Sequence, residues 1–506
     1  MALSRHPGAS LVTEPASPSR GGVFMETYGC QMNGADSEVV LSILAEAGWR
    51  RVDEPSAASV VLLNTCAIRD NAEAKVWQRL GYYRSLKRST PRGSQRVVVG
   101  VLGCMAERLK QKLLESDRMV DLVAGPDAKA LNVQLSADET YADVAPLRRA
   151  GERSAYLSIM RGCNNMCAFC IVPYVRGRER SRPIQSILEE VRRLSESGVK
   201  EVTLLGQNVN SYADFSESAP EPGARRGEDP SEVYAAGFTS VYRPRRAGAV
   251  SFAELLDRAA AVDPEMRVRF TSPHPKDFGE DVIAVIAARP NICKQLHMPA
   301  QSGSSEVLRA MRRGYSRDAY DALAERVRAA LPGVALSTDM ISGFCGETER
   351  DHAASVDLMR RHAFEAAFMF AYSDRERTYA ARHLADDVPE PDKLRRLSEI
   401  IAAFREGLER RAAEERGRLH IVLQQNLIDL QPGDYVAVRV ERATTGSTGG
   451  TLHCVPIAKT SIREFVDVFG SSVPLDTGLA REWPAVGAGE EDQAPVAQQA
   501  LVAAAS

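Results

Sequence analysis

Residues 163–170 read Cys-Asn-Asn-Met-Cys-Ala-Phe-Cys, which places Cys163, Cys167 and Cys170 in one short loop after an apolar run at 156–160. Thiolates at this spacing can bind three irons of a 4Fe-4S cluster and leave the fourth iron open to another ligand. A closed structural metal site needs a fourth protein ligand, and residues 171–178 contain no Cys, His, Asp or Glu. The alternative is three free cysteines in a core loop, but thiols this dense are rarely there for packing. The stretch therefore predicts an iron–sulfur site with one open iron.

The cysteine loop follows the first of a series of strand-like runs that alternate with helical patterns. The runs lie at 156–160, 201–205, 267–271, 294–298, 335–340 and 366–371. Six β-α units suit a partial, open (β/α)6 barrel, which we expect over 149–385 with its site at the carboxyl ends of the strands. Residues 213–250 carry four prolines and four glycines and read as an inserted loop.

An earlier alternation covers 22–146, with strand-like runs at 23–27, 59–63, 96–101 and 120–123. It predicts a doubly wound parallel sheet with helices on both faces. Cys30, Cys66 and Cys104 each follow one of its strands, and the carboxyl ends of such strands converge on one crevice. We expect a second three-thiolate cluster site there, with core packing of buried cysteines as the alternative.

The remaining segments carry weaker signals. Residues 1–21 read as disordered or as the remnant of a transit peptide, 386–416 as a helical connector, 417–470 as a small β module and 471–506 as a disordered tail. The 506-residue chain has nine cysteines, a formal net charge of -3 and no apolar signal segment in front, which argues against a secreted disulfide scaffold. No apolar run approaches the ~18 residues that span a bilayer, so no membrane partner is expected.

The motifs resemble the radical S-adenosylmethionine (SAM) methylthiotransferases over 23–416. The likeness is nearest to the MiaB-type branch, which modifies tRNA, and to its eukaryotic, often mitochondrial, counterpart. It is carried by 163–170, by Thr-Tyr-Gly-Cys-Gln-Met-Asn at 27–33, and by the blocks 64–69, 102–106, 205–212 and 299–304. The stretches 291–295 and 371–376 favour the eukaryotic branch.

The resemblance implies a cofactor role for each cysteine set. Cys163, Cys167 and Cys170 would hold the catalytic 4Fe-4S cluster that binds and cleaves SAM, and Cys30, Cys66 and Cys104 an auxiliary 4Fe-4S cluster that carries the sulfur. The product would be 2-methylthio-N6-isopentenyladenosine next to the anticodon. The alternatives are a methylthiotransferase for another tRNA base or a protein side chain, and a non-catalytic iron–sulfur protein that regulates or binds a partner.

Further residues follow from the same resemblance. The expected SAM contacts are Phe169, Gly206, Gln207, Asn208, Gly343 and Glu347, although turn geometry alone could explain the glycine-rich ends. Arg176, Arg178, Arg180 and Arg182 stand against Glu179 alone and are expected to hold RNA phosphates; a solvated face or internal ion pairs is the alternative.

The expected partners are a tRNA anticodon stem-loop carrying N6-isopentenyladenosine, an electron donor and a sulfur or Fe-S supply system. The chain is expected to be monomeric and to act in the mitochondrion or another organelle, with the cytoplasm as the alternative. The module at 417–470 resembles only the later part of an RNA-binding TRAM domain, so the barrel of that domain is expected to be incomplete.

Overall fold

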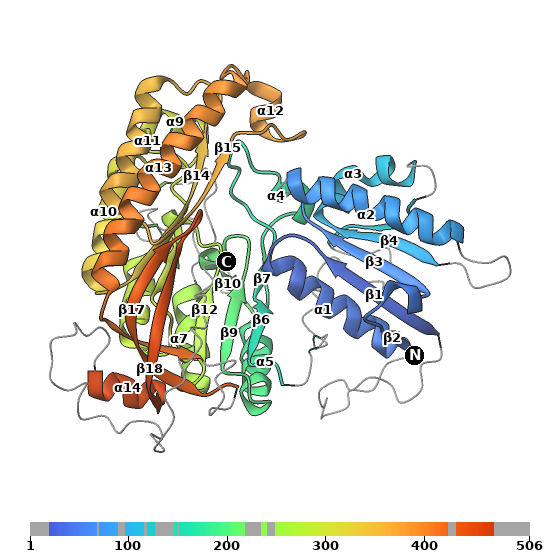
Figure 1. Ribbon diagram of the computed structural model, residues 1–506, viewed down its shortest axis with the longest axis horizontal. Coiled ribbons are helices and arrows are strands. Elements are labelled where there is room, and N and C mark those ends of the chain that lie inside the picture. Colours follow the sequence, from blue (N-terminus) through green and yellow to red (C-terminus); the bar gives the residue numbers. More distant parts are fainter. Residues whose placement is uncertain are drawn as a thin grey trace, which may run out of the picture.

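A computed structural model describes residues 20–67, 70–89, 97–115, 119–126, 146, 148, 151–217, 234–239, 248–423 and 432–469. The predictions for residues 1–19, for parts of the 213–250 insertion and for the tail at 471–506 lie outside these ranges. Figure 1 shows an N-terminal sheet with its helices beside a larger barrel-like body, and a C-terminal sheet at the far side of that body.

The N-terminal sheet has the strand order β2-β1-β3-β4-β5, and every pair in it is parallel. Its strands are β1 (Gly21–Thr27), β2 (Trp49–Arg51), β3 (Val60–Thr65), β4 (Val98–Gly103) and β5 (Leu122–Ala124), and its helices are α1 (Gln31–Glu46), α2 (Asp70–Ser89) and α3 (Cys104–Leu114). Helix α1 covers one face with Leu41 against Leu62, and α2 and α3 cover the other (Figure 1). The sheet is therefore doubly wound, as predicted, with the short edge strand β2 missed by the sequence reading.

The central body contains six parallel strands in two three-stranded sheets, β6-β9-β12 and β13-β14-β15. These strands are β6 (Ser154–Ser158), β9 (Glu201–Leu205), β12 (Arg267–Phe270), β13 (Gln295–His297), β14 (Ala335–Ser342) and β15 (Ala366–Ala371). A parallel bridge between Val268 and Ile292 joins the two sheets. The arrangement is the predicted open barrel.

Helices and short elements pack around these strands. They are β7 (Met160–Arg161), α4 (Val172–Arg176), β8 (Arg180–Ser181), α5 (Ile184–Glu196), α7 (Phe252–Val262), α8 (Glu280–Ala288), α9 (Ser305–Ala310), α10 (Arg317–Ala330), α11 (Glu349–His362) and α12 (Tyr379–His383). Helix α5 buries Ile187, Val191 and Leu194 along one face, because these residues recur at helical spacing. The largest apolar core of the described residues lies between the strands and these helices.

The two ends of the insertion at 213–250 come together as β10 (Ala213–Asp214) and β11 (Val250–Ser251), which pair antiparallel. Within it, Tyr234 and Phe238 are buried in the barrel core. Residues 218–233 and 240–247 lie outside the described ranges.

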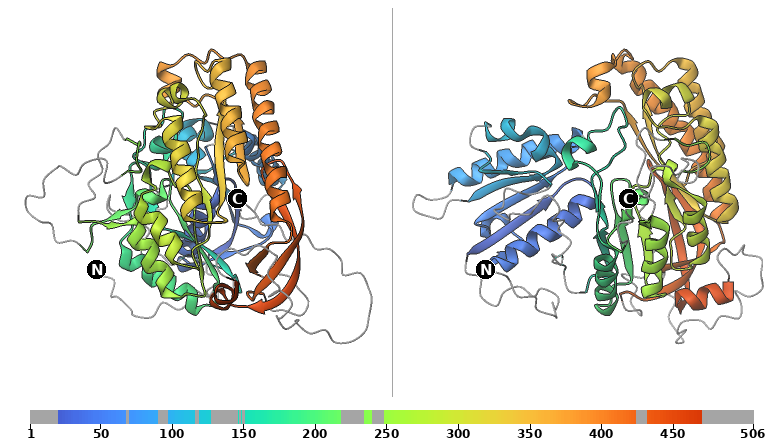
Figure 2. Two further views of the ribbon diagram at one scale, coloured as in Figure 1. Left: turned by 90° about the vertical axis from the view of Figure 1, so that its left-hand side faces the viewer. Right: turned by 180° about the vertical axis from the view of Figure 1, so that it is seen from behind.

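The C-terminal part begins with the long helix α13 (Glu390–Glu415) and continues into the antiparallel sheet β16 (Leu419–Leu423), β17 (Tyr435–Thr445) and β18 (Gly450–Thr460), followed by α14 (Ile462–Phe469). Tyr435 donates to the carbonyls of Lys200 and Glu265 at 2.8 and 3.0 Å. These two residues precede strands β9 and β12, so the C-terminal sheet is attached at the amino ends of the barrel strands (Figure 2).

The predicted fold class is confirmed, with a parallel doubly wound domain, an open six-stranded barrel and a small C-terminal β module. All the named elements fall inside the predicted segments 22–146, 149–385, 386–416 and 417–470, apart from Gly21 at the start of β1. The segment boundaries themselves stay predictions. Among the described residues no helix is both long and apolar enough to cross a bilayer.

Candidate iron–sulfur and cofactor site

The cysteine loop at 163–170 lies at the carboxyl end of the first barrel strand. Cys163 and Cys167 are buried and Cys170 is partly exposed. Burial, followed by the neighbouring thiols Cys170 and Cys167, raises the pKa of Cys163 well above its ordinary value. Burial and then Cys167 raise the pKa of Cys170 to about 12. The three thiols therefore lie in one short, largely buried loop, close enough to influence each other's ionisation.

Backbone contacts hold this loop in place. Cys163 donates to the carbonyl of Gly177 at 3.2 Å, and Ala168 donates to the carbonyl of Met311 at 2.9 Å. The chain enters the loop through Gly162, whose φ is +74°, and a Cβ there would lie 2.0 Å from the carbonyl oxygen of Arg178. Only glycine fits such a close approach at positive φ.

A buried arginine, Arg313, lies against the cysteine loop. It donates from Nη1 to Cys167 Sγ at 3.4 Å, from Nε to the Tyr315 hydroxyl at 2.9 Å and from Nη2 to the Pro299 carbonyl at 3.0 Å. Burial alone would lower the pKa of Arg313, but Tyr315 and Cys167 raise it. The guanidinium thus stays charged beside a thiol that must ionise to bind iron.

The second set of cysteines meets at the carboxyl edge of the N-terminal sheet. Cys30 is the N-cap of α1, Cys66 follows β3, and Cys104 is the first residue of α3, directly after β4. Strands β1, β3 and β4 are neighbours in the sheet. Gly29, which precedes Cys30, packs closely against Cys66, since a Cβ added at Gly29 would lie 2.5 Å from Cys66 Cβ. Burial raises the pKa of Cys104 to about 11, and Cys66 adds to that effect while Arg176 opposes it.

Two buried asparagines fix the turns that carry these cysteines. Asn33 accepts from the Cys30 thiol at 3.3 Å and donates to Asn64 Oδ1 at 3.1 Å. Asn64 donates in return to the Asn33 carbonyl at 2.8 Å. Because these amides are satisfied by each other, their role is to align the strand ends rather than to bind a ligand.

The two cysteine sets are joined through Arg176 and Asp36. Arg176, the last residue of α4, donates from Nε to Cys104 Sγ at 3.2 Å and from Nη2 to Asp36 at 2.9 Å. The other oxygen of Asp36 accepts from Arg161 at 2.7 Å, and Arg161 lies two residues before Cys163. Cys104 also packs against Ile171 of the cysteine loop's continuation. The loop that follows one cysteine set therefore touches the other.

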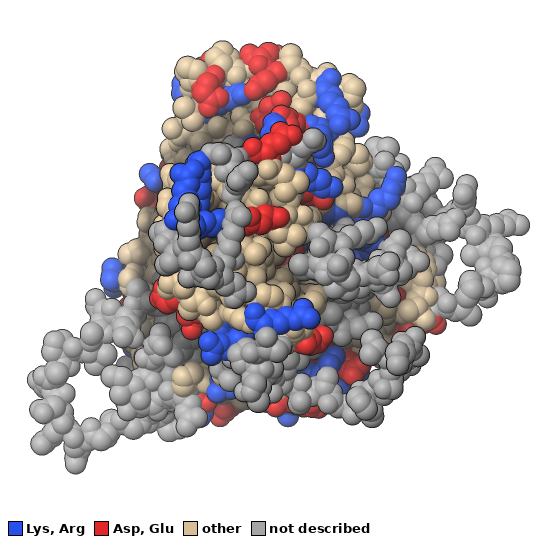
Figure 3. Space-filling model, turned by 90° about the vertical axis from the view of Figure 1, so that its right-hand side faces the viewer, with Lys and Arg blue, Asp and Glu red and all other residues tan. Residues whose placement is uncertain are grey.

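These contacts correct part of the RNA-binding prediction. Arg176 and Arg182 are buried, and Arg182 pairs with the buried Glu190 at 2.7 Å. The alternative of internal ion pairs therefore applies to both residues. Arg176 pairs with Asp36 on helix α1, and Arg182 pairs with Glu190 on helix α5. Arg178 is exposed and Arg180 partly exposed, so contact with RNA phosphates stays a prediction for these two residues. Figure 3 shows Lys and Arg interspersed with Asp and Glu on the face it presents.

The predicted SAM contacts at 206–208 include unpaired polar atoms. Both amide atoms of Gln207 are buried and have no hydrogen-bond partner among the described residues, and the same holds for Asn208 Oδ1. Asn208 Nδ2 donates to Asp277 at 2.9 Å. A Cβ on Gly206 would lie 2.7 Å from Met160 Cγ, which explains the glycine. Buried amide atoms without partners are costly, and a polar ligand would satisfy them.

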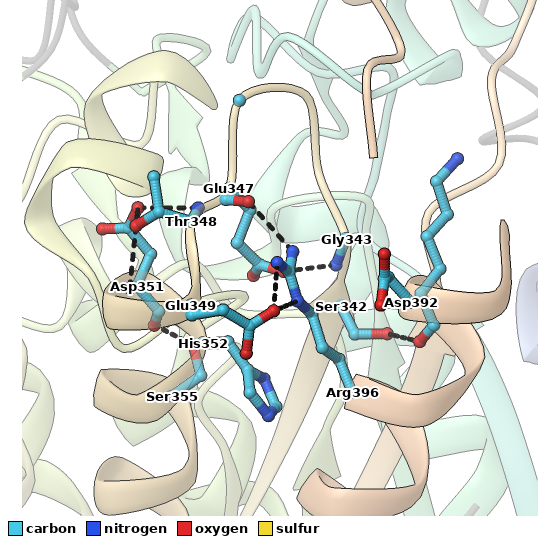
Figure 4. Close-up of polar contacts among 12 residues, drawn as sticks. Ser342, Gly343, Glu347, Thr348, Glu349, Asp351, His352, Ser355, Asp392 and Arg396 are labelled. Carbon is cyan, nitrogen blue, oxygen red and sulfur yellow. Dashed lines mark hydrogen bonds and ion pairs between the residues drawn. The ribbon is translucent and has the colours of Figure 1, made fainter. Parts of the chain in front are cut away.

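The predicted SAM segment at 343–347 packs against helix α13 and is bound by Arg396 of that helix (Figure 4). Glu347 accepts from the Gly343 amide at 2.6 Å and from Arg396 at 3.0 Å, while its other oxygen has no partner among the described residues. A Cβ on Gly343 would lie 2.3 Å from Lys393 Cγ. Glu347 therefore supports the loop, and Phe169 reaches the same segment through an edge-to-face contact with Phe344 at 6.5 Å.

The donor sets fit iron–sulfur clusters better than single ions. No three His, Cys, Asp or Glu side chains within the described ranges converge closely enough to share one metal ion. In a 4Fe-4S cluster each thiolate binds a different iron, so its ligands stand farther apart than those of one ion. Each site offers three thiols, one for each of three irons, and a buried arginine donates to one thiol of each set, Arg313 to Cys167 and Arg176 to Cys104.

The fold and the two cysteine sets define a radical SAM type of protein. Residues 157–359 match the Radical SAM superfamily, and residues 22–125 match a family described as Uncharacterized protein family UPF0004. The chain is 47% identical over 489 residues to the mitochondrial tRNA methylthiotransferase CDK5RAP1 of Rattus norvegicus, covering 87% of this chain and 82% of the relative. It is 44% identical over 478 residues to the tRNA-2-methylthio-N(6)-dimethylallyladenosine synthase of Chloroherpeton thalassium, covering 87% and 98%.

The chain belongs to the tRNA methylthiotransferase family of radical SAM enzymes. The predicted family, enzyme class and cofactors, SAM and 4Fe-4S clusters, are thereby confirmed. A solved structure of the radical SAM methyltransferase TsrM from Kitasatospora setae is similar over 82% of each chain, with a TM-score of 0.48 and 14% identity, a likeness too low to add to the assignment.

The sequence reading missed three residues at this site, Asp36, Arg161 and Arg313. Arg161 gave a usable signal, because a charged residue directly after an apolar strand-like run and two residues before the cysteine loop needs a partner if it is buried. Asp36 and Arg313 gave none, since the sulfur or guanidinium that each contacts lies more than 100 residues away.

Proposed function

We propose that this chain adds a methylthio group to C2 of N6-isopentenyladenosine next to the anticodon of a tRNA, and that it does so in mitochondria. The observation that carries the proposal is that two three-cysteine sets lie against each other, joined through Arg176. The names of the relatives support the tRNA substrate, and the mitochondrial names among them support the compartment.

The residues divide into two roles. Cys163, Cys167 and Cys170 would hold the 4Fe-4S cluster that, with SAM, supplies one-electron cleavage chemistry, and Cys30, Cys66 and Cys104 the cluster that supplies sulfur. Gln207 would bind a polar ligand, because its two amide atoms have no partner among the described residues and suit a group that both donates and accepts hydrogen bonds.

The RNA must present its base to buried groups. A target base in a single-stranded loop can leave its stack at modest cost. Arg178 and Arg180 follow helix α4, which comes after the cysteine loop, and would bind the neighbouring phosphates. An electron donor and a sulfur supply are needed, and the chain acts as a monomer in this proposal.

The test is nucleoside mass spectrometry of tRNA from cells that lack the protein. We expect N6-isopentenyladenosine to accumulate and its 2-methylthio form to disappear, with recovery on expression of the wild-type chain but not of Cys163→Ala. Unchanged 2-methylthio modification would overturn the proposal. Loss of a methylthio group from another base or from a protein would identify one of the alternative substrates.

A further inference from the structure

Arg176 makes contacts that a surface or simple structural arginine does not make. Its side chain is 4% exposed, its Nε donates to Cys104 Sγ at 3.2 Å, and its Nη2 donates to Asp36 at 2.9 Å. Its third nitrogen, Nη1, is buried and has no hydrogen-bond partner among the described residues. A buried guanidinium N–H without an acceptor is costly, so the position implies an acceptor that occupies the site in the working protein.

The position of Arg176 also indicates what that acceptor is. The guanidinium is held between Asp36 at 2.9 Å and Cys104 Sγ at 3.2 Å. Cys104 belongs to the N-terminal cysteine set, so Arg176 lies beside the cluster that this set would hold. Inorganic sulfide and thiolate sulfur both accept hydrogen bonds, and such bonds tune the cluster.

Asp36 extends this contact to the barrel. One carboxylate oxygen binds Arg176, and the other binds Arg161, which precedes Cys163 by two residues. Both arginines flank the loop at 163–170, whereas Asp36 lies on α1, the helix that begins after Cys30. The ion triad of Asp36, Arg161 and Arg176 is thus a polar link between the segments that carry the two cysteine sets.

We propose that Arg176 is a positioning residue for the auxiliary cluster, that its Nη1 donates to a sulfur atom of that cluster, and that Asp36 fixes the spacing between the two clusters. The inference rests on the proposed function only in requiring both clusters. A donor with positive charge stabilises the more negative reduced form, so it raises the reduction potential of the auxiliary cluster.

The first experiment uses the full chain with Cys163→Ala, Cys167→Ala and Cys170→Ala, which leaves only the auxiliary site. After anaerobic reconstitution, we would compare Arg176→Met, Arg176→Lys and the exposed control Arg192→Met by iron and sulfide content, EPR and redox titration. We expect Arg176→Met to lower the midpoint potential by about 59 mV or more, a tenfold change in the ratio of oxidised to reduced cluster. Arg176→Lys keeps the charge and should fall between Arg176→Met and the parent, and Arg192→Met should match the parent.

The outcomes separate the inference from the proposed function. If the parent binds no cluster, both fail. If it binds about four irons and Arg176→Met has an unchanged potential and EPR spectrum, only the inference fails. If Arg176→Met loads no cluster while its circular dichroism spectrum and unfolding midpoint match those of Arg192→Met, Arg176 is needed to hold the cluster, which supports the inference. If Arg176→Met does not fold, Arg176→Lys becomes the test. A midpoint potential of Arg176→Lys equal to that of the parent would then overturn the inference.

The second experiment tests the spacing in the two-cluster protein. Asp36→Asn keeps the size of the side chain but removes the charge that holds both arginines. We expect the dipolar coupling between the two reduced clusters, measured by pulsed EPR, to weaken or broaden in Asp36→Asn and to stay unchanged in Arg192→Met. An unchanged coupling in Asp36→Asn would show that the triad does not set the spacing.

Discussion

Replacement of Gly29 by alanine should remove the auxiliary cluster and leave the other in place. Gly29 has a φ of +120°, and an added Cβ would lie 2.5 Å from Cys66 Cβ and 3.0 Å from Asn33 Oδ1. The backbone strain costs roughly 1–3 kcal/mol, and forcing apart packed groups costs roughly 1–3 kcal/mol more. The steric part acts on a cysteine ligand itself, so it should move Cys66 away from Cys30 and Cys104.

The matched control is Gly151→Ala. Gly151 has a φ of +85° and no atom within 4 Å of an added Cβ, so it carries the backbone strain without the clash. Reconstituted wild-type protein and Gly151→Ala should each hold about eight irons from two clusters, and Gly29→Ala about four. Gly29→Ala should still cleave SAM but form no methylthio product. The reasoning fails if Gly29→Ala retains the iron content and the cluster EPR signals of Gly151→Ala.

Three further outcomes are expected. Cys163→Ser should abolish SAM cleavage, whereas Cys30→Ser should spare it and lose sulfur insertion; equal loss of cleavage in both would contradict the division of roles. Arg313→Met should slow SAM cleavage at least about tenfold, because a donor that orients a cluster ligand is lost. The control Arg309→Met changes an exposed arginine and should leave the rate unchanged. The rates should be compared at equal iron content. Burial, with Glu152 and Glu190 adding to it and Arg148 opposing it, raises the pKa of Glu38 to about 7, so the unfolded chain releases this proton first. The stability that this group contributes is present below pH ~4.5 and lost as the pH rises through about 7. Urea titrations should show that the free energy of unfolding of Glu38→Gln depends less on pH than that of the wild type, and that it exceeds the wild-type value by up to roughly 3 kcal/mol at pH 8.

The chain order of strands and cysteines made most of the fold predictable. A parallel sheet brings strand ends together by topology alone, so three cysteines after three strands could be placed in one crevice without knowledge of any side chain. The weak edge strand β2 was missed because three residues carry little alternation. Local patterns define strands and turns reliably only when they repeat.

The electrostatics of the site could not be predicted in the same way. The basic run at 176–182 suggested a surface for RNA, yet two of its four arginines are buried and form ion pairs with Asp36 and Glu190. Asp36 is 140 residues from Arg176 in sequence, and no periodicity connects them. The number of charged residues in a stretch of sequence gives only its composition. Whether each charged side chain is exposed or buried in an ion pair depends on which elements the fold brings into contact.

The attachment of the C-terminal sheet places a geometric constraint on the substrate. Both cysteine sets lie at carboxyl ends of strands, whereas Tyr435 and Arg267 tie the C-terminal sheet to the amino ends of the barrel strands, with Arg267 donating to the Ile421 carbonyl at 3.0 Å. An RNA that contacted both ends would have to run along the length of the barrel. In the proposed function, the target base would be bound at the end that carries the cysteine loops, and any contact between RNA and the C-terminal sheet would involve a more distant part of the RNA. Affinity and chemistry would then be separable, since changes in the sheet should weaken RNA binding without altering SAM cleavage.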